Sequence, residues 1–166
     1  DFGQADTGQL FLVMEHLDGS SVAQRLRSQG KRGRVMSVRM AAMIGVGTLA
    51  SLGEAHAKGL IHRDIKPENI FLHRCGPDDL TVKVLDFGVA RDEANPITIQ
   101  GTILGTPTHM SPEQVASGQV DNRSDIYSLG IVLYECLCGV VPFSDPSPMR
   151  VAAMQVTAPV PSLGER

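Results

Sequence analysis

The residues best suited to chemistry stand together at positions 62–69, where the sequence reads HRDIKPEN. A carboxylate such as Asp64 can accept or orient the proton of an incoming hydroxyl. Lys66 can neutralise charge on a moving phosphoryl group, and the amide oxygen of Asn69 can ligate a magnesium ion. An isolated HRD tripeptide is usually a charged surface turn, but the whole octapeptide favours a functional site.

A second acidic motif, Asp86-Phe87-Gly88, follows the mostly apolar run 82–85 and begins 22 residues after Asp64. The same three letters open the chain at Asp1, so the order of motifs must decide between the two copies. Only the copy at Asp86 comes after the segment 62–69. The copy at Asp1 precedes the first expected strand, and we expect it to lie in a turn at the end of that strand.

Two further motifs come later in the chain. Residues 105–113 read GTPTHMSPE, and residues 121–130 read DNRSDIYSLG at the start of a strongly apolar helix. A carboxylate beside so apolar a helix needs hydrogen-bond partners, which makes Asp125 a candidate structural residue. The alternative is that Asp125 is a simple helix residue favoured by the N-terminal dipole.

The elements that must position these motifs follow from periodicity and turn signals. A long helix is predicted over 37–58 and a buried one over 124–138, with shorter helices near 20–28 and 147–156. Strands are predicted at 9–14 and as a pair at 69–72 and 81–85 around the turn 76–79. One face of the long helix is expected to carry Met40, Ile44, Thr48, Leu52 and Ala55. The segment 88–112 lacks periodicity, and so long a loop in a domain is usually functional.

In this order and spacing, the motifs resemble those of the protein kinase superfamily, and most of all the bacterial eukaryotic-like (Hanks-type) serine/threonine kinases. The resemblance covers about residues 10–143 and implies an α+β fold, a mainly helical C-terminal lobe with short β-hairpins. It implies that 1–166 is a partial kinase domain, with a hinge strand at 9–14 and the C-lobe over 20–158. The sequence holds no Gly-rich loop, no V-A-I-K lysine, no helix for its glutamate partner and no last C-lobe helices. The chain starts at Asp1 without Met and ends with the linker-like residues 159–162, so both ends are expected to be cuts.

The resemblance also implies roles for single residues. The catalytic residues would be Asp64, Lys66, Asn69 and Thr106, with Thr106 hydrogen-bonded to Asp64 and Lys66. The residues in contact with ATP would be Met14 as gatekeeper, Glu15, Leu17, Phe71 and Asp86. The ligands of Mg2+ or Mn2+ would be Asn69 and Asp86. The regulatory residues would be Arg63, Thr98 and Thr102, through autophosphorylation and pairing with Arg63. The structural residues would be His62, Phe87, Glu113 and Asp125, with Asp125 accepting hydrogen bonds from the catalytic-loop backbone and Glu113 left without its family partner.

The implied activity is transfer of the γ-phosphoryl group of ATP to serine and threonine hydroxyls of proteins, because Lys66 and the Gly-Thr pair at 105–106 are typical of enzymes with those substrates. Without the missing lysine, the 166-residue chain alone is expected to be inactive. Two alternatives stay open. A pseudokinase or binding module is disfavoured by the presence of Asp64, Asn69 and Asp86. A small-molecule phosphotransferase is disfavoured by the segment 105–113.

Composition is in keeping with this interpretation. The chain is 42% hydrophobic and 20% charged, as in globular domains, with a net charge of −3. That charge and the scarcity of aromatic residues argue against nucleic acid or an anionic membrane as the main partner. The expected partners are protein substrates and ATP, with a homodimer for autophosphorylation. Cys75, Cys136 and Cys138 are expected to be reduced thiols in a cytoplasmic protein.

Overall fold

The computed structural model describes residues 2–76, 79–87, 98–99, 102–103, 107–116 and 118–165. Its elements are, in chain order, β1 (Phe2–Gln4), β2 (Leu10–Leu12), β3 (Gly19–Ser21), α1 (Val22–Gly30), α2 (Val38–Ala57), β4 (Ile70–Arg74), β5 (Leu80–Val84), β6 (Thr98–Ile99), β7 (Thr102–Ile103), the 3₁₀ turn η1 (Pro107–His109), α3 (Pro112–Val115), α4 (Asn122–Cys138), α5 (Pro148–Thr157) and the 3₁₀ turn η2 (Leu163–Glu165).

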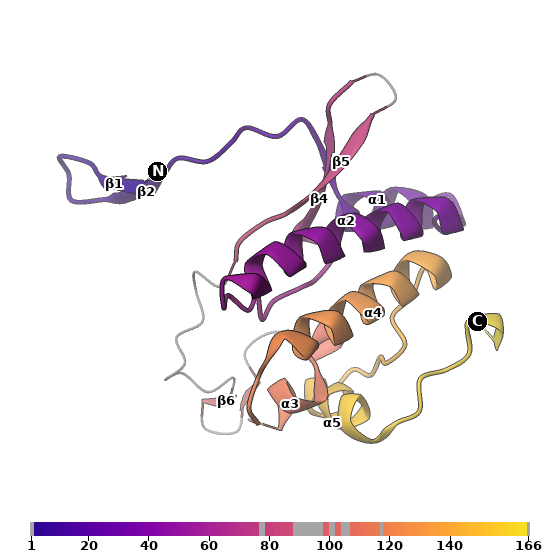
Figure 1. The fold of residues 1–166 in the computed structure, drawn as a ribbon. Helices are drawn as coiled ribbons and strands as arrows, with labels where there is room; N and C mark the ends of the chain where they lie inside the picture. Colours follow the sequence, from indigo (N-terminus) through magenta and orange to yellow (C-terminus); the bar gives the residue numbers. More distant parts are fainter. Residues whose placement is uncertain are drawn as a thin grey trace.

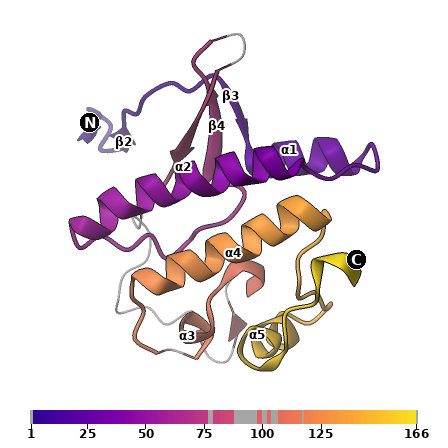
Figure 2. The same ribbon diagram turned by 45° about the vertical axis from the view of Figure 1, so that its right-hand side comes forward.

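Two long helices, α2 and α4, pack against each other at the centre of the molecule (Figure 1). The antiparallel sheet β3-β4-β5 covers the side of α2 that faces away from α4. The short helices α3 and α5 lie together beyond α4, as the turned view shows (Figure 2). The result is a layered arrangement in which α2 is the only long element that contacts both the sheet and a second long helix among the described residues.

The main core forms where α2, α4 and the sheet meet. The face of α2 that is buried carries Ala41, Ile44, Gly45, Thr48, Leu52 and Ala55. This confirms the predicted face, except that Met40 is only half-buried and Ala41 lies deeper. The helix α4 contributes Leu129, Val132 and Cys136, and the strands and loops contribute Ile65, Ile70, Leu72 and Val82. The prediction that α4 is buried nearly all round is too strong, because Ile126 is 46% exposed.

Local signals account for the helix ends. Ser21 and Gln24 form a reciprocal capping box at the start of α1, and Ser37 caps α2 by accepting a hydrogen bond from the Met40 amide. Asp121 caps α4, and Gly139 ends that helix in the left-handed conformation with φ 77°. The predicted helices are therefore confirmed, with ends that differ by no more than two residues.

The predicted strand pair is also confirmed. Strands β4 and β5 are antiparallel, with Ile70 opposite Val84 and Arg74 opposite Leu80. Strand β3 pairs with the other edge of β4. The sheet thus joins the chain before α1 to the chain that follows the segment 62–69.

The N-terminal hairpin corrects one prediction. Phe2 and Gly3 were expected in a turn, but they belong to β1, which pairs with β2 in the register Phe2 opposite Leu12. The reversal lies later, where the Gly8 amide donates to the Ala5 carbonyl over 2.8 Å and Gly8 adopts φ 83°. The turn-forming residues 6–8 therefore connect two strands, β1 before them and β2 after them. Figure 1 shows this hairpin apart from the helices, at the end of an extended segment.

The three cysteines are free thiols. Cys75 is exposed and Cys136 is buried, while Cys138 is half-buried. Burial, together with the charge of Glu135, raises the pKa of Cys136 to about 12. Among the described residues, no helix is long and apolar enough to cross a membrane.

Two glycines of α2 generate a test of the packing between α2 and the sheet. A Cβ at Gly47 would lie 2.5 Å from the Cβ of Val82, whereas a Cβ at Gly53 would meet nothing within 4 Å. We expect Gly53→Ala to stabilise the fold by about 0.5–1 kcal/mol, because alanine is the better helix residue. We expect Gly47→Ala to destabilise it by about 1–3 kcal/mol, because the sheet must move. Urea unfolding of both variants checks this, and equal changes for the two would contradict the packing described here.

Candidate active site

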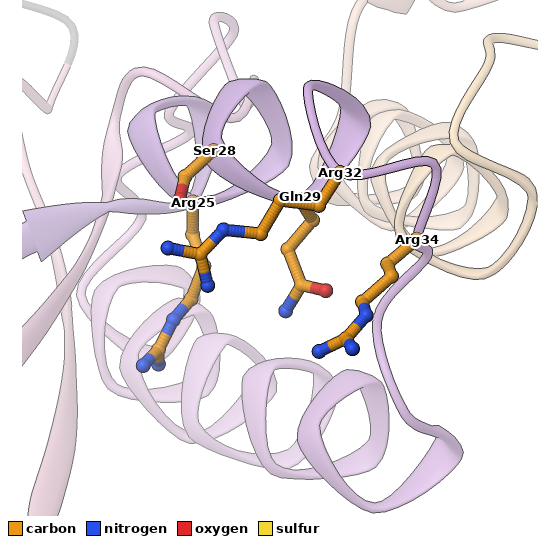
Figure 3. A pocket seen from close by; sticks show the side chains of 5 residues that line it. All are labelled: Arg25, Ser28, Gln29, Arg32 and Arg34. Atoms are coloured by element: carbon orange, nitrogen blue, oxygen red, sulfur yellow. The ribbon is translucent and has the colours of Figure 1, made fainter.

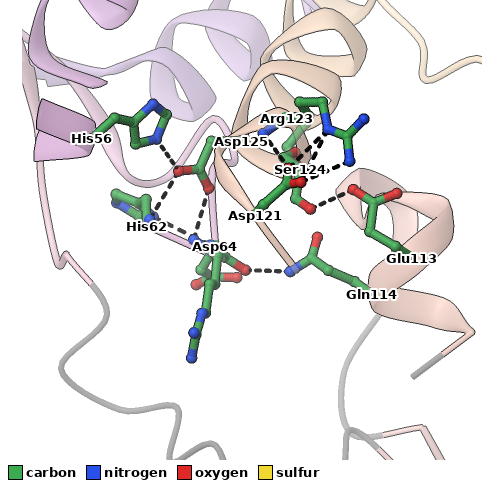
Figure 4. Close-up of polar contacts among 11 residues, drawn as sticks. His56, His62, Asp64, Glu113, Gln114, Asp121, Arg123, Ser124 and Asp125 are labelled. Carbon is green, nitrogen blue, oxygen red and sulfur yellow. Dashed lines mark hydrogen bonds and ion pairs between the residues drawn. The ribbon is translucent and has the colours of Figure 1, made fainter. Parts of the chain in front are cut away.

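Asp125, in the first turn of α4, is the centre of a buried network (Figure 4). Its Oδ1 accepts a hydrogen bond from the Arg63 amide over 2.8 Å, and its Oδ2 accepts one from the His62 amide over 2.9 Å. The Nε2 atom of His56, near the end of α2, lies 2.7 Å from the same Oδ2. The expected hydrogen bonds between Asp125 and the loop backbone are thus present, and His56 is an additional partner that the sequence did not indicate.

The His62 side chain ties the loop to the sheet. It is fully buried, and its Nε2 lies 2.8 Å from the Leu85 carbonyl oxygen, which can only accept. Nε2 therefore carries the proton, and Nδ1 accepts the hydrogen bond from the Asp64 amide over 3.2 Å. The ring also packs against Phe87 with a centroid distance of 4.8 Å and a tilt of 59°. Two segments that are predicted to do chemistry are thereby joined through one histidine.

The Asp64 carboxylate is held by two neighbours in the same loop. Lys66 Nζ lies 2.7 Å from Asp64 Oδ2, and Asn69 Nδ2 donates to that oxygen over 3.2 Å and to the Asp64 carbonyl over 2.9 Å. The side chains of Asp64 and Lys66 are 33% and 38% exposed. The carboxylate is therefore oriented by charge-assisted hydrogen bonds and still reachable from solvent.

Asp86 and Asn69 are brought close through the backbone, because the amide of Leu85 donates to the Asn69 carbonyl over 2.8 Å. The Asn69 amide group uses its N–H atoms on Asp64, which leaves its oxygen as a ligand. The Asp86 side chain is exposed, and no described residue donates a hydrogen bond to it. One amide oxygen and one carboxylate are hard donors of the kind that magnesium prefers, so the two residues fit such an ion.

The backbone is strained at two positions of the site. Arg63 has φ 65° and Asp86 has φ 57°, in the left-handed region that residues with a Cβ rarely adopt. Arg63 is held there from both sides, because its amide donates to Asp125 and its carbonyl accepts from Gln114 Nε2 over 2.7 Å. Such strain costs roughly 1–3 kcal/mol per residue and persists only where the surroundings determine the conformation.

Glu113 has a partner that the sequence did not indicate. It was expected to lack its family partner, and the Ser124 hydroxyl donates a hydrogen bond to its Oε1. Burial pushes the pKa of Glu113 up, while hydrogen bonds from Ser124, its own amide and Ser111 lower it, and the net result lies below the ordinary value. Ser124, at the start of α4, thus provides a hydrogen-bond donor for the Glu113 carboxylate.

Two glutamines with structural roles were missed by sequence reasoning. Gln114 completes a capping box with Ser111 through its oxygen and bonds the Arg63 carbonyl through its nitrogen. Gln155 of α5 is buried, donates to the carbonyls of Pro107 and Thr108 over 3.0 and 2.8 Å, and accepts from Tyr127 Oη over 2.7 Å. The pattern S-x-x-Q predicts the capping box, but neither glutamine carries a local signal for its distant partner.

The residues predicted to contact ATP lie less close together than those around Asp64. Met14 is 68% exposed in the extended segment 13–18, and Glu15 forms an ion pair of 3.0 Å with Lys83 of β5. The Asp18 carbonyl accepts from the Arg74 amide over 2.8 Å, so the end of this segment follows the sheet. Leu17 and Phe71 are half-buried.

Some predicted residues are placed only in part. Thr98 and Thr102 lie in β6 and β7, where the structure describes the backbone. Thr106 lies outside the described residues.

Comparison with known proteins gives a consistent result. A family model of the protein kinase domain matches residues 4–161. Serine/threonine-protein kinase pkn3 of Myxococcus xanthus is 39% identical over 166 residues, which are 97% of this chain and 30% of that protein. PknL of Mycobacterium tuberculosis is 41% identical over 91% of the chain and 36% of that kinase, and PknB of the same species is 39% identical over 97% and 26%. The chain spans about a third or less of the length of these relatives.

The network around Asp125 generates a prediction with a matched control. We expect Asp125→Asn to destabilise the fold by at least about 2 kcal/mol, because an amide cannot accept at both positions and leaves a buried N–H unpaired. Asp121→Asn, four residues earlier, should change stability much less, since asparagine caps a helix as well as aspartate does and the ion pair lost with Arg123 is exposed to solvent. Urea unfolding of the two variants measures the difference, and similar losses would argue against a central role for Asp125.

Proposed function

The chain belongs to the protein kinase domain family, and we propose that the protein containing it transfers the γ-phosphoryl group of ATP to serine and threonine hydroxyls of proteins. The observation that carries this proposal is the geometry of Asp64, a reachable carboxylate held by Lys66 at 2.7 Å and by Asn69 at 3.2 Å. A binding module without catalytic activity would have no need to orient a partly exposed carboxylate in this way.

In this proposal Asp64 orients the substrate hydroxyl and accepts its proton as the oxygen attacks phosphorus. Lys66 is placed beside the same carboxylate, where its ammonium group can neutralise charge that develops on the transferred phosphoryl group. Thr106 is proposed to hydrogen-bond both side chains and to help seat the substrate. His62, Phe87 and Asp125 act indirectly, by holding the loop that carries Asp64.

The cofactors in this proposal are ATP and Mg2+ or Mn2+. Asn69 and Asp86 would hold the metal through an amide oxygen and a carboxylate, and the metal would neutralise charge on the phosphates. The adenine would lie against Met14, Glu15, Leu17 and Phe71, and the contacts of Glu15 with Lys83 and of Asp18 with the sheet support a fixed course for that segment. The phosphate-positioning lysine of the family is absent from the sequence, and we propose that the 166-residue chain alone is inactive.

The arrangement also supports a proposal about which part of a kinase domain this is. A mainly helical body with a three-stranded sheet and a short hairpin is what a C-lobe over 20–158 would have, with β2 inside the hinge strand proposed at 9–14. We propose a cytoplasmic site of action and transient homodimers in which one copy phosphorylates another.

The catalytic assignment is tested by Asp64→Asn in the full-length protein. We expect phosphate transfer from radiolabelled ATP to fall by about 10²–10³, the usual effect of losing a principal charge-stabilising group, while nucleotide binding remains. Asp86→Asn should weaken the binding of magnesium–ATP as well. Asp79→Asn, on the exposed turn between β4 and β5, is the control and should keep full activity. An Asp64→Asn enzyme within tenfold of the wild type would overturn the assignment.

Regulation generates a separate prediction. Thr98 and Thr102 lie in a two-stranded hairpin, opposite Ile103 and Ile99, and we propose that one or both are autophosphorylated and that the phosphate pairs with Arg63. Mass spectrometry of the full-length protein after incubation with ATP and magnesium should find phosphate there. The double variant Thr98→Ala/Thr102→Ala should lose activity. An active enzyme with both threonines unmodified, or full activity in the double variant, would contradict the proposal.

A further inference from the structure

A basic segment lies at the opposite end of α2 from the candidate active site. The segment from Arg25 through Arg39 holds six of the 15 lysine and arginine residues of the chain, and no aspartate or glutamate stands between Asp18 and Glu54. The chain as a whole carries a net charge of −3, so this concentration of positive charge is local. It coincides with α1, the turn that follows it and the first residues of α2.

Part of this segment surrounds a pocket (Figure 3). The pocket has a volume of about 200 Å³ and is lined by Arg25, Ser28, Gln29, Arg32 and Arg34. Arg25, Ser28 and Gln29 share one face of α1, because they are spaced by three and four residues. Figure 3 shows all five side chains on the same side of α1 and the turn.

The backbone of the turn is fixed by its own hydrogen bonds. The Lys31 amide donates to the Arg27 carbonyl over 3.2 Å, and the amides of Arg32 and Arg34 both donate to the Gln29 carbonyl, over 2.9 and 3.1 Å. Gly33 adopts φ 62°, which lets the chain reverse here. The backbone at Arg32 and Arg34 is therefore held against the last turn of α1.

The arginines of the pocket lack acidic partners. Among the described residues, no carboxylate lies within ion-pair distance of Arg25, Arg32 or Arg34. Within the same residues, their side chains make one hydrogen bond, from Arg25 Nη1 to Met40 Sδ at 3.8 Å. The walls offer guanidinium, hydroxyl and amide donors. Three guanidinium groups around one small space repel each other unless an anion lies between them.

We propose that this pocket binds the phosphate group of a phosphorylated serine or threonine side chain on a protein. Such a phosphate carries a charge of roughly −1.5 to −2 and three acceptor oxygens, which match the planar forks of several arginines. The pocket is too small for a nucleotide, since sites for drug-sized ligands begin near ~300 Å³. The segment 19–53 contains no aromatic residue on which a nucleic-acid base could stack.

The choice of a phosphoprotein rests on the proposed function, because an enzyme that phosphorylates serine and threonine supplies this ligand. The pocket is lined by α1 and the turn that precedes α2, whereas the loop 62–69 follows the far end of that 20-residue helix, so the phosphate it binds is not the one being transferred. A segment phosphorylated earlier, on a substrate or on the kinase itself, would be held here while a second hydroxyl reaches the catalytic loop.

The test measures binding to the full-length protein by fluorescence anisotropy. The probe is a labelled peptide of alanine and glycine with one phosphothreonine, and the unphosphorylated peptide is its control. We expect the triple variant Arg25→Gln/Arg32→Gln/Arg34→Gln to lose at least about tenfold in affinity. The variant Arg27→Gln/Arg39→Gln changes two exposed arginines outside the pocket and should bind within about twofold of the wild type. Replacing the three pocket arginines with lysine keeps the charge but removes the forks, and should also weaken binding.

Several outcomes would overturn the proposal. Equal binding of the two peptides, or equal losses in the pocket and control variants, would show charge attraction without a site. The protein could instead bind vesicles of phosphatidylcholine and phosphatidylserine through the three arginines and fail to bind the phosphopeptide. That result would identify an anionic membrane surface as the ligand of the pocket. Thermal unfolding of each variant shows whether a loss of affinity comes from unfolding of the protein. If the triple variant is unfolded, the single variant Arg34→Gln, on the exposed turn, replaces it in the binding measurement.

The same proteins separate this proposal from the proposed function. Phosphate transfer to an unphosphorylated peptide should be unchanged in the pocket variant. An inactive wild-type protein that still binds the phosphopeptide would reject kinase activity and retain the site, and an active protein that does not bind it would reject the site alone.

Discussion

One buried carboxylate determines how the site is built. Asp125 is removed from solvent, and it is tolerated there because two backbone amides and the His56 ring surround its oxygens. A buried charge without such partners would be strongly destabilising, so α4, the end of α2 and the loop 62–69 must come together for the protein to fold. The helices that form the core therefore also determine where the loop 62–69 lies.

Because the loop 62–69 is fixed by Asp125, the positions of the proposed catalytic groups Asp64 and Asp86 are fixed as well. His62 is bonded to Asp125 through its amide and to Leu85 through its ring, so the strand end that leads to Asp86 is fixed relative to Asp64. The unfavourable backbone conformation of Arg63 is stabilised by Asp125 on one side and Gln114 on the other. Rigid support of this kind lets a partly exposed carboxylate keep one orientation without being buried itself.

Sequence reasoning succeeded where the signal is local or where charge and burial conflict. The capping serine and the apolar spacing of α2 predict a helix, and the aspartate in an apolar helix predicts a buried acceptor. It failed where the partner is distant: nothing near His56 or Gln155 indicates contacts 69 and 47 residues away, and Ser124 gives no sign of its bond to Glu113. Strand β1 was missed because three residues carry too little pattern to outweigh a neighbouring turn signal.

The close approach of Gly47 to Val82 has a consequence for divergence among homologues. The helix and the sheet can lie this near only while the two side chains together stay small, so the volume of one position limits that of the other. A homologue with alanine or serine at position 47 should have glycine or alanine at position 82, and a glycine at 47 should permit valine or isoleucine there. The two positions are expected to co-vary in size across an alignment, while Gly53, which meets no neighbour, should vary independently of the sheet.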